Sequence, residues 1–272
     1  MTRLIPITDP ADPRIEAYTS IRERDLTGRH NRFIIEGRVT LEVALTRSRF
    51  SVESLLLSEK RADTLIQELA PHLQGIPVYV APQSVLDQIA GFPMHRGILA
   101  CGLKQDQPAL RAWLAARPET STLVVCVGTS NHDNTGAIFR NAAALGADAI
   151  LLDHESCDPL YRKSIRVSAG TALWLPYFHG ESANTLLQDI ADANYEIWTL
   201  TPRETASPIQ AMTAPRRLAL VLGPEGPGLT DEQIGRGQSV RIPMANQVDS
   251  LNVATSLAIT LSHAHSMRQS ER

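Results

Sequence analysis

The sequence predicts an α/β fold with mainly parallel sheets. Strand-like apolar runs and helix-like segments alternate along almost the whole chain, an order typical of βα units. The runs in the second half, such as T-L-V-V-C-V-G at 122–128, are dense in valine and leucine, which suits strands covered by helices on both faces. A chain of 272 residues can bury one large core or two modest ones, and we expect two domains.

The first domain is expected to cover residues 1–105. It opens with a predicted helix around Pro13–Asp25, after which short strand-like runs alternate with longer segments of helical pattern. No internal repeat or low-complexity tract interrupts them. The strands are predicted at 32–36, 52–57, 76–80 and 97–103, and the helices at 38–47, 60–72 and 82–90.

The second domain is expected to cover residues 120–272, after a linker at 106–119. The linker follows from the polar segment K-Q-D-Q-P, a short amphipathic stretch at 109–117 and P-E-T-S. A terminal helix is predicted from Ser250, a suitable N-cap residue. The strands of this domain are predicted at 122–128, 149–153, 175–178, 195–201, 217–222 and 239–242.

Composition limits the classes of function. No run approaches the roughly 20 consecutive apolar residues of a membrane helix, and the first ten residues lack the apolar core of a signal peptide, so a cytoplasmic protein is expected. The three cysteines, Cys101, Cys126 and Cys157, have no C-x-x-C pairing, and we expect reduced, mostly buried thiols. Apart from His263 and His265, which lie two apart on a predicted helix and face different directions, no histidines have ligand-like spacing, and no metal is expected.

The formal net charge of −3 gives no overall support to nucleic-acid binding, so an RNA surface would have to be local. One candidate is the stretch 14–38, where arginines outnumber acidic residues. A solvated helix with salt-bridged neighbours explains the same pattern. The basic side chains of this stretch are Arg14, Arg22, Arg24, Arg29, His30, Arg32 and Arg38.

Three segments of the second half share one position relative to the predicted strands. In each, an apolar run gives way to glycine, proline, asparagine or aspartate, where open α/β sheets present backbone groups to ligands. The G-x-G-x-x-G fingerprint of dinucleotide-binding folds is absent. The segments are N-H-D-N-T-G-A-I-F-R-N-A at 131–142, L-V-L-G-P-E-G-P-G-L-T at 220–230 and I-P-M-A-N-Q-V-D-S-L-N-V-A at 242–254.

Each segment also has a purely structural interpretation. The glycines and prolines of G-P-E-G-P-G suit a loop that wraps a ligand, and equally a rigid turn before the helix predicted at 230–232. Arg140 offers fixed donors for a phosphate or carboxylate, or an ion pair with Glu225. Ser250 and Asn252 flank unpaired N–H groups at a helix start, where Ser250 alone could be a plain cap.

Together, the three segments and K-S-I-R-V-S-A-G-T-A-L at 163–173 resemble the SpoU (TrmH-like) family of SPOUT RNA methyltransferases over about residues 120–268. The resemblance implies methyl transfer from S-adenosylmethionine to a ribose 2′-hydroxyl of RNA. It also implies a deep trefoil knot, a rare exception among protein chains, and a homodimer through the C-terminal domain with the active site at the interface.

The resemblance also assigns site residues. Arg140 is expected to orient the target phosphate and the developing oxyanion, because a guanidinium is too hard to deprotonate to act as a base. Many relatives have glycine where this chain has Asn246, a residue type that tolerates left-handed backbone geometry. The implied catalytic residues are Asn134, Arg140, Glu225, Ser250 and Asn252, and the implied cofactor-binding residues are Leu222, Gly223, Gly226, Ile242, Met244 and Leu251.

In the first domain, R-F-I-I-E-G-R-V-T-L-E-V-A-L at 32–45 and H-R-G-I-L-A at 95–100 resemble the L30e-like substrate-binding domain of many SpoU enzymes. Ribosomal RNA is the favoured substrate and transfer RNA the alternative, since both would share every C-terminal motif. A catalytically silent RNA-binding or assembly factor would also keep the fold, and the five intact polar residues argue against it. The expected RNA contacts are Arg29, His30, Arg32, Arg38, His95 and Arg96.

Overall fold

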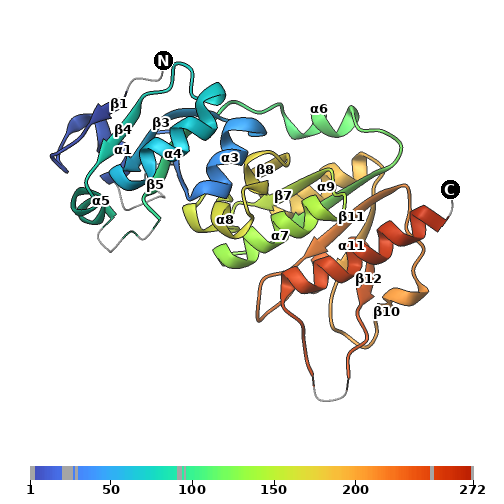
Figure 1. The fold of residues 1–272 in the computed structure, drawn as a ribbon. Coiled ribbons are helices and arrows are strands. Elements are labelled where there is room, and N and C mark those ends of the chain that lie inside the picture. Colours follow the sequence, from blue (N-terminus) through green and yellow to red (C-terminus); the bar gives the residue numbers. More distant parts are fainter. Residues whose placement is uncertain are drawn as a thin grey trace. The chain divides into compact units, whose positions relative to one another are not determined.

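The computed structural model describes residues 4–19, 27, 30–90, 94, 96–245 and 248–270. The chain divides into two compact units. The first comprises Met1–Asp106 and Pro159–Trp174, and the second comprises Gln107–Asp158 and Leu175–Arg272. The sequence did not suggest that residues 159–174 fold with the first unit. Figure 1 shows the strands and helices of each unit.

The first unit contains a five-stranded sheet in the order β1-β4-β3-β5-β2. β4 is parallel to β1 and β3, whereas β5 is antiparallel to β3 and β2. The sequence predicted mainly parallel sheets, and this sheet is mixed because β5 inserts between β2 and β3. Alternating elements in the sequence do not specify such an insertion. The strands are β1 (Leu4–Pro6), β2 (Arg32–Glu36), β3 (Ser51–Ser58), β4 (Val78–Ala81) and β5 (Ile98–Leu103).

The helices of the first unit follow the predicted segments closely. Of the helix expected at 13–25, the described part is a 3₁₀ turn and one α-helical turn, and residues 20–25 lie outside the described part of the chain. The elements are η1 (Pro13–Ile15), α1 (Glu16–Thr19), α3 (Arg38–Thr46), α4 (Glu59–Leu69), η2 (Ala70–His72), α5 (Gln83–Ala90), α8 (Arg162–Val167) and η3 (Thr171–Leu173).

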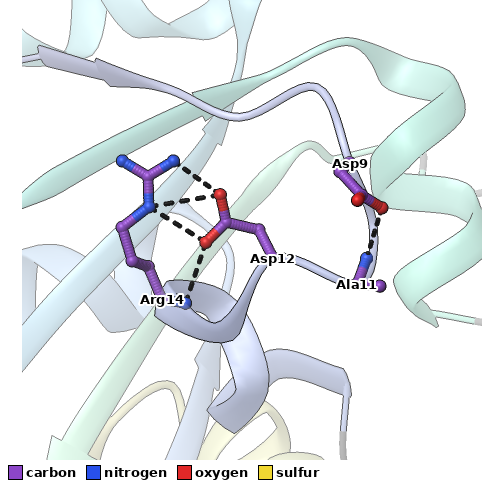
Figure 2. A network of polar contacts seen from close by, with 4 residues as sticks. All are labelled: Asp9, Ala11, Asp12 and Arg14. Atoms are coloured by element: carbon purple, nitrogen blue, oxygen red, sulfur yellow. Dashed lines mark hydrogen bonds and ion pairs between the residues drawn. The ribbon is translucent and has the colours of Figure 1, made fainter.

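A local polar network fixes the start of η1, which leads into α1 (Figure 2). Asp12 Oδ1 accepts hydrogen bonds from the backbone N–H and the Nε of Arg14, both at 2.9 Å, and Asp9 Oδ1 accepts one from Ala11 N. These hydrogen bonds from Arg14 lower the pKa of Asp12 to about 2. Arg14 therefore has a local structural partner, as expected of a helix start with salt-bridged neighbours.

The second unit contains a seven-stranded sheet in the order β10-β12-β9-β11-β6-β7-β8. Every strand pair is parallel, as the dense apolar runs predicted. β6 and β7 are buried along their whole length. The strands are β6 (Ser121–Cys126), β7 (Ala149–Asp153), β8 (Tyr177–Glu181), β9 (Glu196–Leu200), β10 (Ser207–Pro208), β11 (Arg217–Leu222) and β12 (Gln238–Arg241).

Two helices of the second unit position the site. The long terminal helix α11 (Val253–Ser270) lies beside α7 (His132–Ala144), and Asn141 Nδ2 donates a hydrogen bond of 2.8 Å to Ala254 O between them. No helix in the described ranges is long and apolar enough to cross a membrane. The other helices are α6 (Leu110–Ala115), α9 (Ala183–Asp192), η4 (Ile209–Ala211) and α10 (Asp231–Ile234).

Candidate active site

A pocket of about 500 Å³ opens in the second unit. β12, β9 and β11 are neighbours in one parallel sheet, so their carboxyl ends meet at the same edge. The segments that follow these three strands, together with the first turn of α11, line the pocket. The lining residues fall in the ranges 200–203, 222–229, 240–244 and 250–256.

The residues expected to bind a cofactor gather in this pocket. All six line it, although they come from three separate parts of the sequence. Three of the expected catalytic residues, Glu225, Ser250 and Asn252, line it as well. The second and third sequence motifs therefore converge on one cavity, whereas the first, at 131–142, contributes no lining residue. The six are Leu222, Gly223, Gly226, Ile242, Met244 and Leu251. Asn246, the departure noted in the third motif, lies outside the described residues.

The glycine-rich loop is tightly folded. A Cβ on Gly223 would lie 2.6 Å from Leu229 N and 2.8 Å from the carbonyl carbon of Gly228, too close for any side chain. Gly226 and Gly228 have positive φ angles of 90° and 69°, a conformation that favours glycine. The loop then enters α10 through a capping box formed by Thr230. The loop is therefore both a ligand-pocket wall and the rigid turn that its composition allowed.

The start of the terminal helix differs from the prediction. α11 begins at Val253, and Asn252 is its cap: Asn252 Oδ1 accepts hydrogen bonds from Ala254 N at 3.0 Å and Thr255 N at 3.3 Å. The prediction that Ser250 caps the helix was wrong. Serine and asparagine cap helices about equally well, so composition alone could not choose between them. Ser250 is instead an exposed residue of the pocket lining.

Asn134 joins the first motif to the third. α7 begins at His132 and is capped by Asn131, whose Oδ1 accepts a hydrogen bond from Asp133 N at 2.8 Å. This places Asn134 in the first turn, where its side chain is only 7% exposed. Its Oδ1 accepts a hydrogen bond of 2.8 Å from Asn252 Nδ2. Asn134 thus lies next to the pocket without being part of its lining.

Arg140 is an exposed residue of α7 and is not part of the pocket lining. It makes no hydrogen bond or ion pair with any residue that the structure describes, so the possible pair with Glu225 is not formed. Arg140 follows Asn134 by six positions, about 9 Å along the helix. Its guanidinium is therefore available to a group that the chain itself does not supply.

A buried carboxylate that the sequence did not single out holds the loop after β6. Asp153 accepts hydrogen bonds from Gly128 N at 3.0 Å, Ser156 N at 3.0 Å and Ser156 Oγ at 2.7 Å. Gly128 has a positive φ angle of 61°, and a Cβ there would lie 3.2 Å from Pro224 Cβ. The loop that leads into α7 is thereby fixed against the glycine-rich loop.

The pocket has a further wall that sequence reasoning missed. It is the segment directly after β9, in which Arg203 forms an ion pair with Asp231. The available signal was a proline after a predicted strand, as in the other two pocket segments. The segment consists of Leu200, Thr201, Pro202 and Arg203.

The basic residues expected to contact RNA fall into distinct groups. Arg32 is engaged by Glu53 through two hydrogen bonds of 2.8 and 2.6 Å, and Arg38 pairs with Glu42 and Glu68. His30 is exposed. Arg96 is exposed and has no hydrogen-bond or ion-pair partner among the described residues. Arg29 and His95 lie outside the described part of the chain.

The cysteines are free thiols, and burial raises the pKa of each. Cys101 and Cys126 are buried, with their pKa values raised to about 12, whereas Cys157 is partly exposed. Within the ranges that the structure describes, no three His, Cys, Asp or Glu side chains gather in a group that could hold a metal ion.

A parallel α/β sheet with a ligand pocket at the carboxyl edge defines a class of enzymes that bind a small molecule between loops. The chain belongs to the SpoU rRNA methylase family, whose profile matches residues 121–262. The profile of the RNA 2′-O ribose methyltransferase substrate-binding domain matches residues 34–101. These two matches confirm the family predicted from the motifs.

Individual relatives agree with this assignment. The chain is 34% identical over 261 residues to an uncharacterized tRNA/rRNA methyltransferase of Mycobacterium bovis, covering 93% of this chain and 88% of that one. It is 30% identical over 210 residues to the 23S rRNA (guanosine-2′-O-)-methyltransferase RlmB of Haemophilus influenzae, covering 75% and 83%. A crystal structure of an RNA 2′-O ribose methyltransferase superposes with a TM-score of 0.78 at 27% identity, covering 97% and 100%.

Proposed function

We propose that the protein transfers a methyl group from S-adenosylmethionine to a ribose 2′-hydroxyl of ribosomal RNA. Family membership makes the chain an RNA methyltransferase, and its substrate-binding segment belongs to enzymes of ribose 2′-O chemistry. The observation that carries the proposal is the convergence of the second and third family motifs on one pocket, with Asn134 of the first motif hydrogen-bonded to Asn252 beside it.

The pocket suits the methyl donor. Its volume lies within the roughly 300–1,000 Å³ of small-molecule sites. Partly exposed apolar side chains such as Ile242 and Met244 offer surface to an aromatic base, and the bare backbone of Gly223 and Gly226 allows close approach to the polar parts of a ligand. When bound, S-adenosylmethionine supplies a methyl group on a positively charged sulfur.

The chain's own residues then have to align the acceptor. A ribose hydroxyl is a weak nucleophile, so the oxygen must lie in line with the methyl–sulfur bond as it loses its proton. The new bond joins the 2′-oxygen to the methyl carbon, the carbon–sulfur bond breaks, and the proton passes to a phosphate oxygen or water. Arg140 holds the target phosphate and stabilises the developing negative charge. Asn134, fixed by Asn252, positions the ribose.

A homodimer through the C-terminal unit completes this proposal. Arg140 lies outside the pocket lining and has no partner among the described residues, which fits a role at a site completed by a second subunit. Large apolar side chains are exposed in the segment that leads into α11 and on α11 itself, as expected of a surface that another chain covers. These are Val248, Leu251 and Ile259. We also propose that the chain around the pocket forms the family's trefoil knot.

Residues 1–105 act in this proposal as the L30e-like RNA-binding domain, residues 106–119 as the linker, and residues 120–272 as the methyltransferase domain. Ribosomal RNA is favoured because a relative that covers three quarters of this chain is a 23S rRNA enzyme, whereas the names of other relatives include transfer RNA as well.

Radiolabelled S-adenosylmethionine and separated pools of ribosomal and transfer RNA test the proposal. Label in ribosomal RNA, lost when Arg140 is replaced by alanine, is the expected result. Label in transfer RNA alone would contradict the favoured substrate. Donor binding without transfer to either RNA, or to assembled ribosomal subunits, would favour a silent RNA-binding factor.

A further inference from the structure

A second cavity, of about 350 Å³, lies in the first unit. It is distinct from the methyl-donor pocket, and its lining is dominated by three cations. Arg61 and Lys60 come from the first turn of α4, and Arg96 comes from the segment before β5. The other lining residues are Ser58, Gln83, Asp87 and Met94.

All three cations are exposed and have no acidic partner among the described residues. This separates them from Arg32 and Arg38, which are engaged by glutamates of the same unit. Exposed lysine and arginine side chains commonly have acidic neighbours, so three cations without one around a single cavity leave a local excess of positive charge.

The one carboxylate among the lining residues of the cavity is already engaged. Asp87 Oδ1 accepts hydrogen bonds from Gln83 Nε2 at 2.8 Å and from Met94 N at 2.7 Å, so it holds the wall of the cavity together. Glu36 is buried and is contacted by two arginines of α8, Arg162 at 3.1 Å and Arg166 at 3.7 Å. Neither carboxylate pairs with the cations of the cavity.

Neutral donors add to the cations. Ser58 is the residue before α4, and its side chain does not cap that helix. It is only 3% exposed, lines the cavity, and its hydroxyl makes no hydrogen bond with any described residue. α5 also begins at the cavity, with Gln83. Two helix N-termini, each carrying partial positive charge, therefore meet an unpaired hydroxyl and three cations.

The shape of the cavity depends on two glycines. A Cβ on Gly97 would lie 2.4 Å from Ser58 Oγ, and the residue has a positive φ angle of 59°. Arg96 Nη1 lies 3.1 Å from the position of a Cβ on Gly37, so its guanidinium rests on bare backbone. A side chain at either position would therefore displace the hydroxyl or the guanidinium from the cavity wall.

We propose that this cavity binds a backbone phosphate of the substrate RNA through Lys60, Arg61, Arg96 and the Ser58 hydroxyl. This inference rests on the proposed function, and the phosphate contact would hold the substrate RNA in position for methyl transfer. Phosphate is the chemistry that fits, because guanidinium, ammonium, hydroxyl and helix N-termini all donate to a phosphate oxygen. Arg32 and Arg38 then support the fold of the domain rather than bind RNA.

The test measures how binding of deproteinised ribosomal RNA depends on salt. Removing one cation that neutralises a phosphate should lower the slope of log K against log salt by about 0.7 to 0.9. The double variant Lys60→Gln, Arg61→Gln and the single variant Arg96→Gln should lower the slope and weaken binding about tenfold. In turnover assays they should raise KM for RNA and leave kcat and donor binding unchanged.

The matched control is Arg47→Gln, which removes one exposed arginine from the same unit at the C-terminal end of α3. It should leave the slope unchanged, and Arg96→Lys should keep most of the wild-type slope because it keeps the charge. Slopes equal to that of Arg47→Gln, with methylation by the wild type intact, would overturn the phosphate site and leave the proposed function standing. A wild-type protein that neither binds nor methylates RNA would overturn both.

Discussion

Asn252 Nδ2 donates a hydrogen bond of 2.8 Å to Asn134 Oδ1, while Asn252 Oδ1 caps the terminal helix through Ala254 N and Thr255 N. One side chain therefore uses its two ends for different purposes. It starts α11 at the pocket wall, and it holds the first turn of α7, which carries Asn134, beside that wall.

Replacing Asn252 should separate these two purposes. Serine keeps a cap but cannot reach Asn134, and should lower the free energy of unfolding by about 1 kcal/mol. Alanine loses the cap as well, and should cost about 2 kcal/mol. Both variants should reduce methyl-transfer turnover at least tenfold, measured alongside denaturant unfolding.

Asn141→Ser is the matched control, because it breaks another hydrogen bond between the same two helices, to Ala254 O, and neither of these two residues lines the pocket. It should cost a similar free energy of unfolding and leave turnover intact. If Asn252→Ser retained full turnover, Asn134 would not need this partner.

Arg140→Ala should abolish methylation, by about a hundredfold or more, with donor affinity unchanged. The residue is exposed and unpaired within the described chain, so the free energy of unfolding should change by less than about 0.5 kcal/mol. Arg216→Ala, at another exposed arginine of the same unit, should have no effect on turnover. Normal turnover by Arg140→Ala would remove the residue from the mechanism.

Gly223→Ala should prevent donor binding while the unit stays folded. The added Cβ would meet backbone atoms of residues 228 and 229, so the loop must move and the pocket wall with it. Gly235→Ala adds the same methyl group outside the pocket, where its nearest contact is 3.3 Å from Asp231 O, and should bind the donor normally. Calorimetric titration with S-adenosylmethionine distinguishes the two, and equal affinities would show that the loop is not a donor site.

Mixed dimers test whether the site lies between subunits. Arg140→Ala and Gly223→Ala are each expected to be inactive, and in a mixed dimer one pocket keeps Gly223 and faces Arg140 of the other subunit. Co-expression should therefore restore about a quarter of wild-type activity by random pairing. Activity no higher than that of either variant alone would place Arg140 and the pocket in the same subunit's site.

Thiol reactivity tests the packing of the second unit. The thiolate is the reactive form, and burial raises the pKa of Cys126 to about 12, so this group stays neutral below that pH. At about pH 8, iodoacetamide should modify Cys157 before Cys126 or Cys101, and all three only after unfolding. Peptide mass spectrometry provides the order, and early modification of native Cys126 would contradict the buried strand end.

The sequence predicted the parallel sheet of the second unit because β6, β7 and β11 are dense apolar runs followed by glycine, proline or a polar residue, whereas β10 (Ser207–Pro208) has no apolar run and was not predicted. The same pattern located the glycine-rich loop and the third motif. The pattern missed the pocket segment 200–203, because its T-P-R sequence matches no motif of the family. It also missed Asp153, because the hydrogen-bond partners of this buried carboxylate come together only in the folded chain.

Other features depend on tertiary packing that local sequence does not specify. In the sequence, Arg32 and Arg38 are basic residues of the first domain just as Arg96 is. Only the structure shows that they form ion pairs, Arg32 with Glu53 and Arg38 with Glu42 and Glu68. Likewise, Lys60 and Arg61 look like ordinary residues of a solvated helix until Arg96 is placed across the cavity from them.

The most direct test of the central claim is the chemical position of the transferred methyl group. Ribosomal RNA labelled by the enzyme with radioactive S-adenosylmethionine is digested completely in alkali, which cleaves every linkage whose 2′-oxygen is free. The proposed reaction predicts label in alkali-resistant dinucleotides, because a methylated 2′-oxygen cannot attack the adjacent phosphate. Label recovered only in mononucleotides would show methylation of a base and would contradict the account.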